Sequence, residues 1–183
     1  MELVRPDREH LDGYLDALRR GWSPNTERDT SREQLAEVEA DPDAFVAGMD
    51  DRDPVGRTVT LPDGTEVPRL PGFVRWMWDD EFCGSINLRW QDGTPELPPH
   101  CLGHIGYAVV PWRRRRGHAT EALRRMLPLA SEVGLPYVEI TTDEDNTASQ
   151  RVIEANGGVL VERFVKPDSS GGGRGLRYRI ALT

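Results

Sequence analysis

The stretch PWRRRRGHATEAL, residues Pro111 to Leu123, places four arginines and a glycine directly before a segment with helical spacing. The preceding segment, HIGYAVVP (104–111), is predicted to be a strand that ends at Pro111. The apolar positions that follow recur at i, i+3 and i+4: Ala119, Ala122, Leu123, Met126, Leu127, Ala130 and Val133. This spacing is typical of an amphipathic helix. The stretch therefore predicts a strand, a turn and a helix in succession.

Such a turn is suited to binding an anion. The first backbone N–H groups of a helix have no partner within the helix, and the helix dipole adds positive potential there. Gly117 lets a ligand approach the main chain, Ala119 keeps the next turn nearly bare, and the preceding arginines supply donors for phosphate oxygens. A P-loop is excluded because no Gly-Lys-Ser/Thr follows, and the lack of GxGxxG argues against a Rossmann dinucleotide turn.

Two other interpretations of the arginine run remain open, a solvated surface segment before an ordinary helix and a nucleic-acid patch. The net charge of the chain is −8, which disfavours a general nucleic-acid surface. Residues 1–99 hold 22 acidic and 11 basic side chains, whereas residues 100–183 hold 9 and 12. This asymmetry favours an anionic ligand on the second half and makes the first half more hospitable to cations.

Composition predicts one cytoplasmic domain. The 183 residues, 37% hydrophobic and 30% charged, suit a single globular core. No apolar run is long enough for a membrane span, and MELVRPDREH lacks the apolar region of a secretory signal. Cys83 and Cys101 lie 18 residues apart without a CxxC pair, so we expect reduced thiols and no metal site.

The remaining segments predict a mixed α/β sheet with helices on its faces. In the first half we expect a strand at Glu2–Val4, a helix over Leu11–Leu18, and a hairpin of Phe73–Trp78 and Phe82–Trp90. Ser31 and Gln34 resemble a capping box for a helix through about Ala40. LPDGTEVP and DSSGGGRG predict turns.

The second half of the chain is predicted to alternate. After the strand and helix described above, YVEITT reads as a strand and Asn146–Asn156 as a helix, followed by the strands VLVERFV and LRYRIAL. Alternation of strands and helices of this kind builds a sheet that helices cover.

On these residues the chain resembles the GNAT acetyltransferase superfamily. RRRGHA, Arg114 to Ala119, matches the [RQ]xxGx[GA] turn of that family. GHIGYAVVPWRRRRGHATEAL followed by ITTDEDNTASQRVIEANGGVL is similar to one branch of predicted GNAT acetyltransferases. The similarity is strong over 103–160 and looser in WMWDDEFCGSINLRW and RYRIAL, and the first 70 residues match only in general layout.

The resemblance implies a fold and a cosubstrate. The GNAT fold has a central mixed, mostly antiparallel sheet that splays between its fourth and fifth strands and is flanked by helices. Residues 1–183 would form one such domain, with 1–72 as a variable acceptor-side segment and 73–183 as the hairpin and acetyl-CoA-binding core. The cosubstrate would be acetyl-CoA, without a metal.

The resemblance also assigns roles. The pyrophosphate would be held at the turn, and the pantetheine by the backbone of the strand before it, with Asn146 at the pantetheine end. The implied cofactor-binding residues are Tyr107, Ala108, Val109, Arg114, Arg115, Arg116, Gly117, His118, Ala119, Thr120 and Asn146. For His118 a contact with coenzyme A is favoured over a catalytic role.

The implied reaction is attack of an amine on the thioester carbonyl. The oxyanion needs a donor, most plausibly a backbone N–H of the Tyr107–Val110 strand. Many GNAT enzymes protonate the leaving thiolate with a tyrosine seven residues after the asparagine, but this chain has Ile153 there. Ser149, or a water held by Asn146, is the substitute that we predict.

For the general base, His104 is the first candidate, because an ordinary imidazole pKa near 6.5 suits water-relayed proton removal. A purely structural His104 is also open, as is an ordinary helix position for Ser149. Glu139 and Glu81 are weaker candidates for the base. Trp76, Trp78 and Trp90 either line the acceptor pocket or pack in the core.

The sequence thus predicts an acetyl-CoA-dependent N-acetyltransferase acting on a small primary amine. Acetylation of a protein N-terminus or lysine, and a non-catalytic acyl-CoA-binding module, are the alternatives. Dimers are frequent among proteins of this family, so the resemblance leaves a homodimer open.

Overall fold

The computed structural model describes residues 1–26, 28–61, 63–167 and 171–183. Its elements are β1 (Glu2–Val4), α1 (Leu11–Arg19), α2 (Ser31–Ala40), α3 (Pro42–Gly48), β2 (Asp50–Asp51), β3 (Thr58–Thr60), β4 (Glu66–Pro68), β5 (Gly72–Asp79), β6 (Glu81–Arg89), β7 (Ile105–Val109), α4 (His118–Glu132), β8 (Tyr137–Asp143), α5 (Thr147–Glu154), β9 (Val159–Val165) and β10 (Arg174–Ala181). The predicted order of the second half is confirmed. The turns predicted in LPDGTEVP and DSSGGGRG lie partly outside the described residues.

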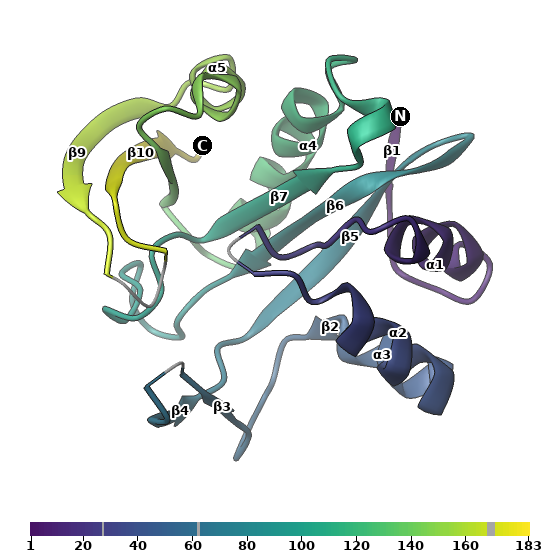
Figure 1. The fold of residues 1–183 in the computed structure, drawn as a ribbon. Helices are drawn as coiled ribbons and strands as arrows, with labels where there is room; N and C mark the ends of the chain where they lie inside the picture. Colours follow the sequence, from purple (N-terminus) through teal and green to yellow (C-terminus); the bar gives the residue numbers. More distant parts are fainter. Residues whose placement is uncertain (27, 62, 168–170) are drawn as a thin grey trace.

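The strands form two main sheets that separate between β7 and β8 (Figure 1). The first has the order β1–β5–β6–β7 with β2 also on β5, and the second has the order β8–β10–β9. When β1, β5, β6 and β7 are counted as the first four strands of the central sheet and β8 as the fifth, this is the splay that the resemblance implies between the fourth and fifth strands. Every strand pairing among the described residues is antiparallel. The sheets are thus mostly antiparallel as expected, and these residues contain no parallel pair that would make them mixed.

The first sheet is covered on both faces, because its side chains alternate between two cores. Met77 and Ile86 face a core built with α4 and the second sheet, whereas Trp76 and Phe82 face a core built with α1. Gly84 allows close contact between β6 and β7, since a Cβ there would lie 2.2 Å from the Ala108 carbonyl oxygen. Fully burying one large apolar side chain stabilises the folded state by about 1.5–3 kcal/mol. Because both faces of the sheet bury such side chains, the two cores together hold the strands in position.

The α1 face carries one correction. Thr30, not Ser31, is the N-cap of α2, and no side chain caps that helix end, so the predicted capping box is wrong. The Gln34 side chain instead accepts a hydrogen bond from the Tyr14 hydroxyl of α1. That contact holds α2 against α1 at the edge of the site described below.

The three tryptophans follow the core alternative. Trp76 is fully buried and stacks on Tyr14, with ring centroids 4.8 Å apart. Trp78 packs edge-on against His10, and Trp90 packs against Phe73. None of the described helices is long and apolar enough to cross a bilayer.

Candidate functional site

The turn before α4 presents bare main-chain amides. Gly117 is the N-cap of α4 with φ +82°, and no side chain caps the helix. The first helical hydrogen bond runs from Glu121 N to Gly117 O, so the N–H groups of His118, Ala119 and Thr120 have no acceptor within the helix. A Cβ on Gly117 would meet no atom within 4 Å, and Arg115 also has positive φ at 62°. No side chain caps these amides, and the space beside Gly117 is open.

The predicted arginines directly precede these amides in the chain and are exposed. Arg114, Arg115 and Arg116 are exposed, and none of them forms an ion pair with a described residue. Arg114 Nε donates to the Val109 carbonyl oxygen at 3.3 Å. Arg113, the first arginine of the run, differs from the other three because it forms an ion pair with Glu81 at the hairpin turn. That pairing also places Glu81 in an ion pair rather than in a site where it would accept a substrate proton.

The side chains of the helix start are less available than its backbone. His118 is buried, and burial lowers the pKa of its imidazole. Asp79, Arg113 and Arg116 are among the charges that act on it, and its Nε2 is buried without a hydrogen-bond partner among the described residues. The Thr120 carbonyl oxygen accepts from Asn156 Nδ2 at 3.2 Å, which ties α4 to the end of α5. We expect His118 and Thr120 to contribute to anion binding through their backbone N–H groups.

The strand β7 offers main-chain groups to the gap between the sheets. Val110 N donates to Cys83 O at 3.0 Å, so in the antiparallel register Ala108 also directs its backbone groups to β6. Tyr107 and Val109 then direct theirs to the opposite edge, which faces β8. Of the three predicted pantetheine-binding residues, Tyr107 and Val109 have this orientation and Ala108 does not.

His104 joins the two sheets at the point where they separate. Its backbone N donates to Glu139 O at 2.8 Å, and its Nδ1 accepts from Glu139 N at 2.9 Å. Its Nε2 lies 3.1 Å from Pro95 O and must donate to it, so the ring is neutral with both nitrogens engaged. The side chain is 1% exposed, and burial lowers its pKa. This geometry favours a structural role over the predicted role as base.

Two hydroxyl groups meet across the gap. Tyr107 extends from β7 to α5, where its hydroxyl lies 2.8 Å from Ser149 Oγ. Burial raises the pKa of Tyr107 to about 12. Asn146 is the N-cap of α5 and its Oδ1 accepts from Ser149 N at 3.0 Å, which leaves the amide NH₂ free to donate elsewhere. Ser149 is therefore held by two neighbours. The Tyr107 hydroxyl was not expected from the sequence, although strand alternation already put it on the face away from His104.

The other predicted positions are occupied by structural contacts. Ile153, where the family has its tyrosine, is fully buried, and a Cβ on Gly158 would lie 2.3 Å from its Cγ2. Glu139 pairs with Arg177 at 3.0 Å and Arg179 at 2.6 Å, and its pKa is lowered despite partial burial because these two arginines stabilise the carboxylate. Neither residue points to the gap as a free group.

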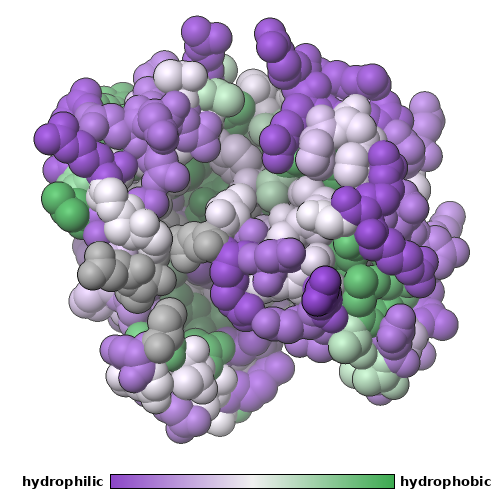
Figure 2. All heavy atoms as spheres, viewed as in Figure 1, coloured by the Kyte–Doolittle hydropathy of each residue, from purple (hydrophilic) through white to green (hydrophobic). Residues whose placement is uncertain are grey.

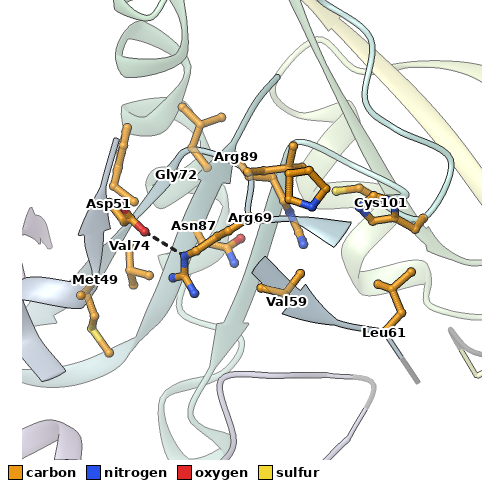
Figure 3. A pocket seen from close by; sticks show the side chains of 16 residues that line it. Met49, Asp51, Val59, Leu61, Arg69, Gly72, Val74, Asn87, Arg89 and Cys101 are labelled. Carbon is orange, nitrogen blue, oxygen red and sulfur yellow. Dashed lines mark ion pairs between the residues drawn. The ribbon is translucent and has the colours of Figure 1, made fainter. Parts of the chain in front are cut away.

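A cleft lies on the α1 side of β5–β7, in the hollowed and largely hydrophilic face of the molecule (Figure 2). It consists of two cavities of about 320 and 370 Å³ that share six lining residues: Met49, Val74, Asn87, Arg89, His100 and Cys101. We call this the acceptor cleft. It reaches Gly106 and Tyr107 at one end and Asp51 and Arg69 at the other, where these two form the ion pair drawn in Figure 3.

Arg89 and His100 are functional candidates that sequence reasoning missed. Both line the two cavities, and Asn87 beside them accepts from Gly106 N at 2.8 Å through Oδ1. The alternation of β6, which turns Asn87 and Arg89 away from Ile86 and Leu88, was the available signal. His100 lies in a proline-rich loop, where no periodicity predicts direction.

The described residues contain no group of three His, Cys, Asp or Glu side chains that could hold a metal ion. Cys83 and Cys101 are both free thiols and both buried.

Comparisons with known proteins show similarity in the family model and in the fold. A family model described as an acetyltransferase (GNAT) domain matches residues 2–159. No curated protein sequence matches the chain. Similar solved structures include the microcin C7 self-immunity acetyltransferase MccE in complex with acetyl-CoA and AMP, at TM-score 0.64 and 10% identity over 98% of this chain and 91% of that one. RimL, a ribosomal L7/L12 alpha-N-protein acetyltransferase in complex with coenzyme A, gives TM-score 0.62 and 13% identity over 98% and 93%. A chimera of the spermidine N-acetyltransferase SpeG from Vibrio cholerae with hSSAT gives 0.56 and 12% over 99% and 96%.

Proposed function

We propose, from the premise that this chain belongs to the GNAT family of acetyltransferases, that it transfers the acetyl group of acetyl-CoA to a primary amine of a small molecule. The observation that carries the proposal is the row of uncapped amides at the start of α4, next to three exposed arginines that form no ion pair with a described residue. A diphosphate is the ligand that such a corner suits best, because oriented N–H groups and guanidinium groups both donate to phosphate oxygens.

The residues at this corner fit coenzyme A. The N–H groups of His118, Ala119 and Thr120 would hold the pyrophosphate, and the exposed arginines would add charge for it and for a further phosphate. The edge of β7 that Tyr107 and Val109 present to the gap would pair with the amide groups of the pantetheine arm. Bound there, the coenzyme supplies an acetyl group activated as a thioester.

The main chain of β7 then stabilises the reaction. As the amine attacks, a C–N bond forms, the carbonyl oxygen becomes an oxyanion, and the C–S bond breaks when the intermediate collapses. A backbone N–H that faces the gap, such as that of Val109, is the oxyanion donor that the geometry supplies. Oriented donors of this kind are worth about 2.7–4 kcal/mol in other enzymes.

The departing thiolate requires a proton, and we assign its donor to Ser149. Its Oγ is fixed by the Tyr107 hydroxyl, and its backbone by the Asn146 side chain. Because burial keeps the phenol of Tyr107 protonated, it can donate a hydrogen bond to Ser149 Oγ while the Ser149 hydroxyl donates toward the sulfur. The proton that the sulfur gains is balanced by the one that the attacking amine loses. This arrangement would replace the tyrosine that many GNAT enzymes have at the position where this chain has Ile153.

For the proton that the amine loses, His100 is the candidate that the cleft offers. It lines both cavities, whereas His104 is locked between Glu139 and Pro95. Imidazole is the side chain suited to accepting a proton near neutral pH. A His100→Gln variant should lower kcat/KM for the amine, with acetyl-CoA affinity unchanged.

A thiol-release assay with acetyl-CoA and a broad panel of amines tests the proposed function. We expect turnover with small primary amines, together with acetyl-CoA binding by calorimetry. Turnover on peptides alone would instead indicate protein acetylation. Tight acetyl-CoA binding without turnover on any amine or peptide would indicate the non-catalytic module.

A further inference from the structure

The charge of the acceptor cleft differs from that of the sequence around it. Residues 1–99 are strongly acidic, yet Asp51 is the one carboxylate among the described residues that line the cleft. That carboxylate is buried and pairs with both Arg57 and Arg69, the latter at 2.9 Å. Two cations against one anion leave this end of the cleft positive. The sequence expectation that the acidic first half would favour a cation therefore does not hold for the cleft itself.

Arg89 adds a second positive charge to the cleft. Its side chain forms no ion pair or hydrogen bond with any described residue, although it lines both cavities. It extends along the sheet toward β7, since a Cβ placed on Gly106 would lie 3.8 Å from its Nη2. Gly106 directly precedes Tyr107, whose main chain borders the proposed thioester position. Arg89 therefore lies within the reach of a small molecule whose amine attacks there.

We infer that the acceptor carries a carboxylate in addition to its amine, and that Arg89 binds that carboxylate. This inference rests on the proposed function and specifies its substrate class. A guanidinium can donate two parallel hydrogen bonds to a carboxylate, which orients the molecule and its amine together. Asn87, fixed by its bond to Gly106, lines the cleft beside Arg89 and has its NH₂ group left to donate. A polyamine would instead place its remaining ammonium groups against Arg89 and Arg69.

Matched acceptors test the inference. γ-Aminobutyrate, β-alanine and phenylalanine are compared with butylamine, propylamine and phenethylamine, and with spermidine, by kcat/KM at saturating acetyl-CoA. We expect the carboxylate-bearing amines to be preferred about 10- to 100-fold, the range for a hydrogen-bonded charged group. Equal or better use of the plain amines or of spermidine by the wild-type protein would overturn the inference.

Variants of Arg89 locate the effect. Arg89→Gln should remove most of the preference by raising KM for the carboxylate-bearing amines, with KM for acetyl-CoA unchanged. Arg89→Lys, which keeps the charge but not the two-pronged donor, should fall between. Arg19→Gln removes an exposed arginine on α1 outside the cleft, and should leave the preference intact. A preference that persists in Arg89→Gln would contradict the inference.

Failure of the proposed function has a separate readout. If no amine is turned over, calorimetry of γ-aminobutyrate, β-alanine and phenylalanine with the protein saturated with coenzyme A decides the point. Binding that Arg89→Gln weakens about tenfold or more would support the carboxylate site without catalysis. Absence of binding in the wild-type protein would overturn it.

Discussion

At the scale of single residues, the paired hydroxyls of Tyr107 and Ser149 are the feature that distinguishes this site. Tyr107 comes from β7 and Ser149 from α5, so their 2.8 Å contact spans the gap between the two sheets. In the proposed mechanism, this contact would place the proton donor on the side opposite to the acceptor cleft. The sequence identifies Ser149 only as a residue beside Asn146, because a contact between residues 42 apart has no local signature.

Ser149→Ala should lower kcat about 100-fold, at the lower end of what a general acid contributes, and leave acetyl-CoA affinity nearly unchanged. Tyr107→Phe, which keeps the ring and the packing, should cost about tenfold through loss of one hydrogen bond. Single-turnover kinetics with the amine saturating would measure both. Wild-type rates in Ser149→Ala would remove Ser149 from the mechanism.

Ile153 gives the complementary prediction. Because its side chain is fully buried and close to Gly158, a tyrosine there must overpack the core. Ile153→Tyr should therefore reduce the free energy of unfolding by about 1–3 kcal/mol without raising turnover. Urea denaturation and the thiol-release assay check the two parts. A more active Ile153→Tyr protein would show that the position faces the coenzyme after all.

At the scale of elements, His104 controls how β7 and β8 separate. The ring takes the place of one backbone hydrogen bond between the strands, because its Nδ1 accepts from Glu139 N. Its Nε2 donates to the Pro95 carbonyl oxygen in the preceding loop. A rigid contact at this point lets the strands diverge beyond it, where the pantetheine would lie. His104 is thus a positioning residue for the gap rather than a group that touches substrate.

The pH dependence of stability tests this role. Burial lowers the pKa of His104 in the folded protein, so the unfolded chain binds the proton more readily. The stabilisation is then fully present above about pH 6.5, the unfolded value, and is lost as pH falls through the lower folded pKa. We expect the free energy of unfolding to decline from pH 7 to pH 5 in the wild-type protein. His104→Ala should be less stable at pH 7 and should show a shallower decline; an unchanged slope would contradict the assignment.

Elements with strong periodicity were predictable, and contacts between elements were not. The helix from His118, the hairpin of β5 and β6 and the order of the second half follow from the spacing of apolar residues. The capping box at Ser31 failed because Gln34 is engaged by Tyr14, a partner 20 residues away. In the same way, the motif predicted the amide corner. The hydrogen bonds that engage both ring nitrogens of His104, and the lack of an ion-pair partner for Arg89 among the described residues, depend on neighbours distant in the sequence.

At the scale of the whole molecule, charge is arranged by position in space rather than by position in the chain. The acidic excess of the first half does not reach the acceptor cleft, where arginines outnumber Asp51. The exposed arginines before α4 form a second positive region at the coenzyme corner. The two regions adjoin opposite ends of β7, so both anionic reactants would be drawn toward the strand where acetyl transfer is proposed.

The amide corner is the central claim, and calorimetric titration of acetyl-CoA into Gly117→Asp and Gly117→Asn tests it most directly. Both variants place a side chain at φ +82°, where Asn and Asp are tolerated, so their backbone strain is matched. The aspartate would accept from the amides of the helix start and repel phosphate. We predict that Gly117→Asp loses at least about 100-fold in affinity and Gly117→Asn about tenfold, with similar melting temperatures. Wild-type affinity in a folded Gly117→Asp protein would contradict the account.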